Sequence, residues 1–525
     1  MKRFALPVLA ALCFLALAAG CSPRTTPCVN PLTYTDIPDN DVVRVGEDYY
    51  MVSTTMYFCP GAPIMHSRDL VHWRIVDYVY DCLEDDDVYN LRGGANAYGQ
   101  GQWATSLRYE GGRWYALFIA NDQRKTYIYT TPELGQPWTR QVIDRPFHDA
   151  SLLFEDGRVY VAWGNGDIRL TELESDLSGV KAGGVDQVLF RSPREGYMLR
   201  AEGAHIYHIG DWYYVLVIDW PSGGVRTETC WRSRELLGPY EPKVILQGAF
   251  DGRRDGVAQG AIVDTPCGDW YAVMFQDHGA VGRIPTLQPL AWENGWPMLG
   301  EGGVPVKEFS VKLPPDGEDY VWASDEFDAE ALPLVWQWNH KPLDGCWSLS
   351  ERPGWLRLTT GQLATGLPDA RNTLTQRTVG PACTSTVLLD ASGLQVGDFA
   401  GLSAFQSHRA DIGLRRTKAG LELYALQETP QREGRTVRRV SRELLCEPAR
   451  QETVQLRIRY DFDADQAILG YSWDGADWTD LPEPLQMRYT LDYFTGYRSA
   501  LYCYATRTLG GHADFDWFRQ ESQNR

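Results

Sequence analysis

Glu202 is the acidic residue whose surroundings most suggest chemistry. It stands in the run Ala201-Glu202-Gly203-Ala204, where small neighbours leave room for a ligand beside the carboxyl group. A carboxyl group held in such a place can donate or accept a proton during a reaction. A single acid at the start of a strand is more often a solvent-exposed charge, however. A functional site is favoured here because the local pattern recurs elsewhere in the chain.

Five stretches share this pattern, which consists of a polar or aromatic head residue, an apolar strand, a glycine turn and a second strand rich in Tyr, Trp and Val. The head residues are Asp39, Trp103, Asp149, Glu202 and Gln259. Their spacing of roughly 45 to 65 residues suits the blades of a β-propeller with inserted loops better than a solenoid, which needs a tighter repeat. Because the first strand of each blade lines the central channel, we expect all five heads to meet at one mouth of that channel.

Length and composition limit the number of domains, the fold class and the partners that this chain can have. At 525 residues the chain is too long for one ordinary domain, so two domains are expected. Aromatic residues make up 12% of the chain, including 19 Trp and 28 Tyr, which is typical of a β-rich protein that handles carbohydrate. The formal net charge of −19 would repel a phosphate backbone, so nucleic acid is excluded as a partner.

The N-terminus predicts export. Lys2 and Arg3 precede an apolar run, 4–19, that is too short to span a bilayer. This run ends in the letters LAAGC, which resemble a bacterial lipoprotein box. The resemblance implies a signal peptide over 1–21 with a lipidated Cys21, followed by a tether over 22–29. The protein is then expected in the periplasm or at the cell surface, held to a membrane only through its lipid anchor; simple secretion is the alternative.

The cysteines do not describe a disulfide framework. The chain has 11, of which Cys13 lies in the leader and Cys21 is the lipidation candidate. The remaining ones are odd in number and widely spaced, and no Cys-x-x-Cys pair suggests zinc. We therefore expect most of them to be buried small hydrophobic residues.

Several motifs resemble the signature segments of glycoside hydrolase family 43. The segments are 35–50, 59–73, Trp103-Ala104, 148–151, Glu202-Gly203, 275–283 and 295–297. The family consists of inverting enzymes with a five-bladed propeller, typified by β-xylosidases and α-L-arabinofuranosidases. The resemblance implies an all-β chain with a catalytic propeller over 30–308.

The same resemblance implies roles for the three head residues that have carboxyl groups. Asp39 matches the general base, Glu202 the general acid, and Asp149 the acid that orients the other two and tunes their pKa values. The chemistry agrees, because inversion at an acetal needs two carboxyl groups. One is protonated and donates its proton to the leaving oxygen, and the other is ionised and activates water on the opposite face. A third carboxylate nearby disfavours ionisation of the acid. No cofactor is expected for this chemistry.

Other positions match the substrate pocket of the family. Trp103 is expected to stack on a sugar and Arg283 to make polar contacts, with Phe58, His148 and Gln259 as further substrate-binding candidates. This sequence also departs from the family pattern. Asn40 and Thr105 replace prolines, His148 stands where some xylosidases have an aromatic residue, and Gln259 replaces a histidine that often lies near a central ion or water. These departures weaken any transfer of substrate preference.

A second domain is predicted after a linker over 309–324. Strands alternate between turns over 325–521, a pattern typical of a β-sandwich. The segment resembles the jelly-roll sandwich of the concanavalin and laminin-G type that follows the propeller in the xylosidase branch, where a sandwich loop walls the active site. The matching region here is 493–498. Asp328 and Asp516 are predicted to share a structural Ca²⁺; alternatively, both are charges on edge strands.

The sequence therefore predicts an exo-acting inverting hydrolase. Its expected products are terminal β-D-xylose or α-L-arabinofuranose, released from plant cell-wall oligosaccharides such as fragments of xylan, arabinoxylan, arabinan or xyloglucan. Two alternatives remain open. An endo-acting arabinanase would need an open groove, and a sugar-binding propeller without catalysis would not need all three carboxylates. Serine chemistry is disfavoured because the chain has no Gly-x-Ser-x-Gly elbow.

Overall fold

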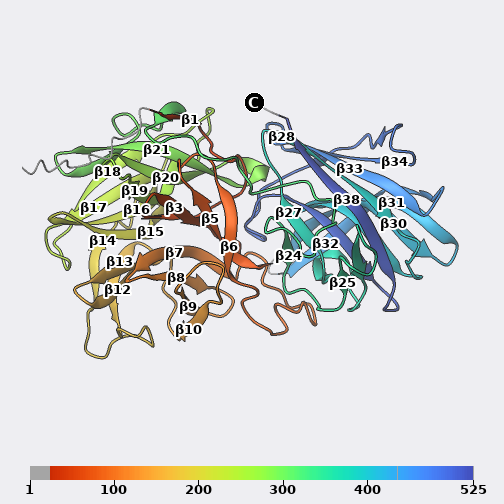
Figure 1. Cartoon of the computed structure of the whole chain (residues 1–525), viewed down its shortest axis with the longest axis horizontal. Helices are drawn as coiled ribbons and strands as arrows, with labels where there is room; N and C mark the ends of the chain where they lie inside the picture. The colour runs from red at the N-terminus through yellow and green to blue at the C-terminus, as the bar shows by residue number, and fades with distance from the viewer. Residues whose placement is uncertain (1–23, 434–435, 524–525) are drawn as a thin grey trace, which may run out of the picture.

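The computed structural model describes residues 24–433 and 436–523, and it contains two β-rich bodies packed side by side (Figure 1). The first body is a propeller and the second a sandwich. Within the described residues, the helical elements are two 3-10 turns, Gly279–Val281 and Leu367–Asp369. The predicted all-β chain with a five-bladed propeller followed by a β-sandwich is confirmed.

Each propeller blade is a four-stranded antiparallel sheet. Blade one contains β2 (Asp41–Val45), β3 (Asp48–Val52), β5 (Gly61–Ser67) and β6 (Arg74–Tyr80), and blade two contains β7 (Gln102–Glu110), β8 (Arg113–Ala120), β9 (Lys125–Thr131) and β10 (Thr139–Ile143). Blade three contains β11 (Ser151–Glu155), β12 (Arg158–Trp163), β13 (Asp167–Leu173) and β14 (Asp186–Arg191), and blade four contains β15 (Tyr197–Ile209), β16 (Trp212–Pro221), β17 (Thr227–Ser233) and β18 (Glu241–Gln247). Blade five contains β19 (Val257–Asp264), β20 (Trp270–Asp277), β21 (Arg283–Glu293) and β22 (Trp296–Leu299).

The first strands of the blades form a closed ring. β2 contacts β7, β7 contacts β11, β11 contacts β15, β15 contacts β19, and β19 returns to β2. In each blade the first strand is joined to the second by a short turn, as in the pair β15 and β16, where Gly210 adopts a φ of 61° between Ile209 and Trp212. Such a left-handed backbone suits glycine, which has no Cβ. The N-terminal ends of all five first strands therefore lie at one mouth of the channel.

Two short strands lie in segments that were predicted as a tether and a linker. β1 (Thr26–Val29) pairs antiparallel with β23 (Glu308–Val311), with Thr26 opposite Val311 and Val29 opposite Glu308. The described part of the predicted tether, 22–29, thus holds an ordered strand, and the predicted linker, 309–324, begins with one. The backbone groups of these segments satisfy one another across the start and end of the propeller. The predicted signal peptide over 1–21 and Cys21 lie outside the described residues.

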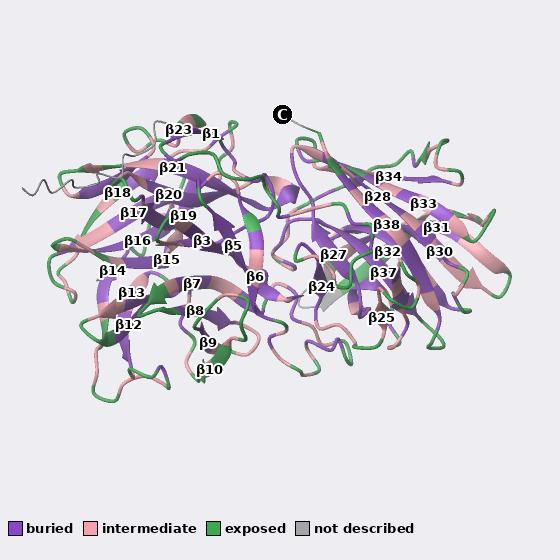
Figure 2. Cartoon of the chain, in the orientation of Figure 1, coloured by how far each residue is buried: buried purple, intermediate pink, exposed green. Residues whose placement is uncertain are grey.

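The second body contains two packed sheets. The first is formed by β4 (Phe58–Cys59), β24 (Gln337–Asn339), β27 (Leu374–Arg377), β29 (Asp398–Phe405), β30 (Arg409–Thr417), β31 (Gly420–Glu433), β32 (Thr436–Pro448) and β37 (Arg498–Ala505). The second is formed by β25 (Trp347–Ser348), β26 (Leu356–Thr359), β28 (Ala382–Asp390), β33 (Thr453–Asp461), β34 (Gln466–Ser472), β35 (Thr479–Asp480), β36 (Leu485–Gln486) and β38 (His512–Ser522). In both bodies the strands carry long stretches of buried residues (Figure 2).

The propeller contributes a strand to the sandwich. β4 lies in the loop between β3 and β5, yet it pairs with β24, with Phe58 opposite Asn339. Cys59 of the same strand forms a disulfide with Cys82, a pairing that the wide spacing of the cysteines did not predict. Because backbone hydrogen bonds cross from one body to the other, the sandwich is fixed against the propeller rather than joined only by a linker.

In the described part of the chain, no helix is long and apolar enough to cross a membrane.

Candidate active site

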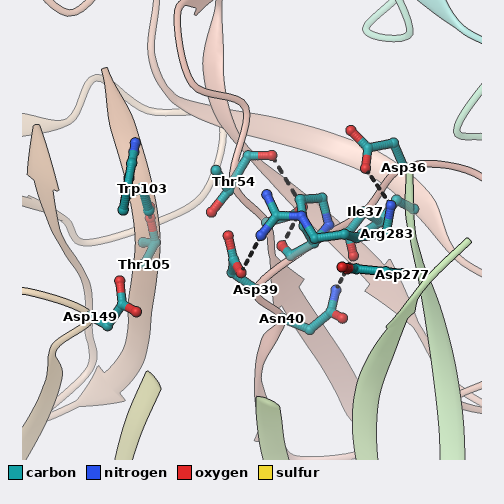
Figure 3. A network of polar contacts seen from close by, with 12 residues as sticks. Asp36, Ile37, Asp39, Asn40, Thr54, Trp103, Thr105, Asp149, Asp277 and Arg283 are labelled. Atoms are coloured by element: carbon teal, nitrogen blue, oxygen red, sulfur yellow. Dashed lines mark hydrogen bonds and ion pairs between the residues drawn. The ribbon is translucent and has the colours of Figure 1, made fainter. Parts of the chain in front are cut away.

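The five predicted head residues lie at the mouth where the first strands begin. Three of them have left-handed backbones, with φ of 54° at Asp39, 44° at Asp149 and 59° at Gln259, and Gly203 beside Glu202 has a φ of 66°. Residues other than glycine rarely adopt this conformation, and such strain is concentrated at functional sites. Figure 3 shows Asp39, Asp149 and Trp103 facing a common space. The prediction that the heads of different blades would converge is confirmed.

Asp39 is held by a buried arginine. Nη1 of Arg283 donates a hydrogen bond of 2.8 Å to Oδ1 of Asp39, and both side chains are less than a tenth exposed (Figure 3). In the described structure, Nε and Nη2 of Arg283 have no hydrogen-bond partner. Buried donors of this kind are costly unless a ligand or water satisfies them. Arg283 therefore orients Asp39, balances its charge and keeps donors available for a substrate.

The backbone of Arg283 is fixed in turn by Asp36, which no motif in the sequence marks. Oδ1 of Asp36 accepts a hydrogen bond of 2.8 Å from the Arg283 amide, and Oδ2 accepts one of 2.9 Å from the amide of Gly496 in the sandwich. Burial raises the pKa of Asp36 above its ordinary value, against the opposing effect of Arg283. A single carboxyl group thus couples the arginine to the neighbouring domain.

Glu202 receives two hydrogen bonds on one oxygen atom. Oε2 lies 3.0 Å from Nε2 of His148 and 2.5 Å from Nδ2 of Asn165. Both partners can donate, and both use the same acceptor, so a neutral Glu202 would carry its proton on Oε1. The loop of Asn165 is anchored by its glycines, because Gly164 donates to the carbonyl of His148 and Gly166 to that of Ala201. The general-acid candidate is therefore held in one orientation.

Asp149 and His148 form a charge-coupled pair behind Glu202. Nε2 of His148 lies 3.6 Å from Oδ2 of Asp149. Burial raises the pKa of Asp149 to about 7, and the charges of Glu202 and Asp39 act in the same direction. The neighbouring charge of Asp149 raises the pKa of His148 to about 9. The two shifts place an imidazolium beside a carboxyl group that titrates near neutral pH, which suits a pair that tunes its neighbours.

A loop of the sandwich walls the site, as predicted for 493–498. The ring of Phe494 packs edge-on against Trp103 at 5.4 Å, and the guanidinium of Arg283 lies 4.6 Å from its centroid. The loop is fixed to the propeller, because the amide of Tyr497 donates to the carbonyl of Ala280 at 3.0 Å. In the described structure Nε1 of Trp103 has no partner. The mouth is therefore closed on one side by aromatic rings and not open as a groove.

Gln259 is positioned by a buried glutamate. Its backbone amide donates a hydrogen bond of 2.7 Å to Oε2 of Glu228 on β17. Its side chain lies against Gly203, where an added Cβ would come within 2.9 Å of the Gln259 side chain. Glu228 is fully buried, and burial raises its pKa to about 8. The polar amide of Gln259 is thus held next to the acid candidate by a carboxyl group that stays neutral near pH 7.

The buried Glu228 predicts a pH dependence of stability. Its pKa is about 8 in the folded protein and 4.5 in the unfolded chain, so the folded state binds more protons between these values. Its contribution to stability is fully present below the unfolded pKa and is lost as pH rises through the folded pKa. We expect Glu228→Gln, which cannot ionise, to flatten the fall in Tm between about pH 5 and about pH 9.

Calorimetry of the wild type, of Glu228→Gln and of the exposed control Glu110→Gln tests this expectation. The control should retain the wild-type slope of Tm against pH. Equal slopes for all three proteins would show that Glu228 is ionised in the folded state.

One predicted assignment differs from the structure. Phe58 is 1% exposed and lies in β4 under the guanidinium of Arg498, 3.7 Å from its ring centroid. A ring without exposed surface packs the two domains together and cannot contact a substrate, so its assignment to substrate binding is wrong. Asp328 is exposed, and the described acidic, histidine and cysteine side chains gather no group of three around it and Asp516. Because Ca²⁺ also binds backbone and amide carbonyl oxygens, the structural Ca²⁺ shared by Asp328 and Asp516 stays a prediction.

One group of three such side chains exists within the described residues, namely His148, Asp149 and Glu202, with ligand atoms within 4.8 Å of one another. Its members are already joined by the hydrogen bond between His148 and Glu202. This contact accounts for the cluster without a bound metal ion. Together with Asp39 on another blade, it supplies the acid and base that acetal hydrolysis requires.

Comparison with known proteins agrees with this chemistry. The model of "Glycosyl hydrolases family 43" matches residues 28–297, and that of "Beta xylosidase C-terminal Concanavalin A-like domain" matches residues 324–521. The β-xylosidase of Formosa agariphila is 27% identical over 93% of this chain and 89% of its own length. The non-reducing end α-L-arabinofuranosidase of Bacteroides ovatus is 30% identical over 63% of this chain and 64% of its own length.

A solved structure from Bacteroides eggerthii, described as bifunctional GH43-CE, has the same fold. It superposes with a TM-score of 0.88 at 42% identity and covers 96% of this chain. This chain spans 64% of the length of that protein. The similarity includes both the propeller and the sandwich.

Proposed function

Because this chain belongs to glycosyl hydrolase family 43, as its motifs predicted, we propose that it removes terminal pentose residues from hemicellulose-derived oligosaccharides. The proposed products are β-D-xylose or α-L-arabinofuranose. Relatives named for each activity support both sugars, so the pentose itself is left to experiment. The observation that carries the proposal is the meeting of Asp39, Asp149 and Glu202 at one mouth beside Arg283 and Trp103.

In the proposed mechanism, the sugar lies between carboxyl groups from different blades. Glu202 protonates the leaving oxygen from Oε1, since its Oε2 is occupied by His148 and Asn165. Asp39 accepts a proton from a water that attacks the anomeric carbon on the opposite face. The charges of Asp149 and His148 lie beside Glu202. Arg283 donates hydrogen bonds from its unpaired nitrogens to sugar hydroxyls. The product has the opposite anomeric configuration.

The closed mouth favours exo action over an endo-arabinanase. Phe494 packs on Trp103 and under Arg283, so one side of the site ends in a wall contributed by the sandwich. A terminal sugar fits against such a wall, whereas an internal segment of a chain needs an open path on both sides. A panel of aryl β-D-xylosides and α-L-arabinofuranosides, with oligosaccharides from xylan and arabinan, tests the proposal. Release of single pentoses supports it, and release of oligomers from internal cuts contradicts it.

A sugar-binding propeller without catalysis is the second candidate. Binding requires stacking and hydrogen bonds, but not three carboxyl groups from different blades at one mouth. Hydrolysis of any aryl pentoside separates the two candidates, since a binding module leaves the chromogenic substrate intact.

We propose in addition that the protein is exported and anchored to a membrane through Cys21, because its leader ends in LAAGC. Cys21→Ala should move the protein from the membrane fraction to the soluble fraction, since the acylation site is lost. Fractionation of cells that express the wild type and the variant, followed by immunoblotting, measures this. Wild-type protein that is already soluble after export would contradict the lipid anchor.

A further inference from the structure

The hairpin that carries Glu202 continues beyond it at the mouth. β15 begins at Tyr197 and β16 ends at Pro221, and these two residues pair with each other. In the first blade, by contrast, β2 begins at Asp41, after the head residue Asp39. Blade four therefore projects past the ring of head residues on the side of the acid. The residues of this projection are close to whatever leaves when Glu202 gives up its proton.

A pocket of about 600 Å³ lies at the open end of this hairpin, opposite the turn at Gly210. Its lining consists of Met198, Trp220, Gly223, Gly224, Val225 and Arg254. Met198 is 65% exposed, which is unusual for a large apolar side chain. Trp220 pairs with Leu199, so about three strand residues, roughly 10 Å, separate it from Glu202. The pocket and the acid candidate thus belong to the same two strands at the same mouth.

Trp220 is held in place without a ligand. Its Nε1 donates a hydrogen bond of 3.0 Å to the carbonyl of Gly224, and the guanidinium of Arg226 lies 4.9 Å from its ring centroid. Arg226 is anchored in turn by an ion pair of 2.6 Å with Asp277. A ring that is already ordered loses little conformational entropy when it binds a partner. Such fixed aromatic rings with a few polar neighbours are typical of small-molecule sites.

We propose that this pocket binds the sugar units on the leaving-group side of the bond that is cut. The inference rests on the proposed function. A general acid must face the leaving oxygen, so the chain beyond that oxygen runs out on the side of Glu202. On that side it meets Trp220 and Met198, which offer apolar surface to sugar rings, and Arg254, which offers donors to their hydroxyls. The preferred substrates are therefore oligosaccharides rather than disaccharides.

Kinetics with substrates of different leaving groups test the pocket. The probes are p-nitrophenyl β-D-xyloside and xylotetraose, or p-nitrophenyl α-L-arabinofuranoside and arabinotetraose, according to the pentose that is released. We expect Trp220→Ala to lower kcat/KM for the tetraose about tenfold or more and to change that for the aryl pentoside less than about twofold. Met198→Ala, at an exposed site that does not support folding, should show the same selectivity with a smaller loss.

Trp212→Ala is the matched control, because Trp212 begins the same strand at the opposite end of the blade. It should leave the ratio of the two kcat/KM values unchanged. Equal losses on both substrates for Trp220→Ala, or unchanged values for both Trp220→Ala and Met198→Ala, would overturn the pocket assignment while leaving the hydrolase intact. A wild type that cleaves neither substrate would instead overturn the proposed function, and this inference with it.

Discussion

Replacing Glu202 with Ala should slow the hydrolysis of natural oligosaccharides by roughly 10² to 10⁴ fold. A sugar alkoxide is a poor leaving group and needs the proton that Glu202 supplies. An activated aryl group such as dinitrophenolate departs without one, so the same variant should lose much less activity on that substrate. The measurement is kcat for wild type and variant on an oligosaccharide and on the activated aryl pentoside.

The exposed residue Glu195, on the loop that precedes β15, provides the control for this substitution. Glu195→Ala changes the same charge near the same hairpin and should leave both rates close to wild type. Equal losses on both substrates for Glu202→Ala would remove Glu202 from the role of general acid.

Replacing Asp39 with Asn should slow both substrates alike, by a factor in the same range of roughly 10² to 10⁴. Water still needs a base whichever group leaves, and an amide cannot take its proton. Asn suits this test because it tolerates the left-handed backbone of Asp39, whose φ is 54°. It also keeps an oxygen that can accept the hydrogen bond from Arg283.

Circular dichroism of Asp39→Asn verifies that the fold survives the substitution. A loss confined to the oligosaccharide would contradict the base assignment, because it would mean that Asp39 acts on the leaving group. Together, the two variants distinguish protonation of the leaving group from activation of water, because only the first depends on which group leaves.

Much of the fold could be predicted because its signals are local and repeated. Each blade repeats a head residue, an apolar strand and a glycine turn, so the five-fold pattern is visible without any contact map. The turn at Gly210 and the convergence of Asp149 and Glu202 followed from that repetition. The sandwich was predictable for the same reason, from alternation along its strands.

What could not be predicted depends on contacts between distant segments. Asp36 gives no local signal, yet it joins the amides of Arg283 and Gly496. The pairing of β1 with β23 and of β4 with β24 likewise joins segments far apart in the sequence. Phe58 was misassigned for this reason, since nothing in its neighbourhood shows that the sandwich covers it.

Asn165 is an intermediate case. It lies between Gly164 and Gly166, a turn signal that the sequence does contain. A turn signal does not say where the turn points, however, and its contact with Glu202 depends on the packing of blade three against blade four. The sequence could have nominated the turn, but not its partner.

The most direct test of the account is the configuration of the first product. Asp39 and Glu202 come from different blades, with Asp39 held by Arg283 and Glu202 by His148 and Asn165, so a sugar and a water are expected between them. Inverting enzymes use such a separation, about 6.5 to 9.5 Å, whereas retaining enzymes need about 5 Å. Proton NMR of a fresh digest, read before mutarotation, should show the anomer opposite to that of the substrate. Appearance of the same anomer first, or a glycosyl group trapped on Asp39, would contradict the account and make Asp39 a nucleophile.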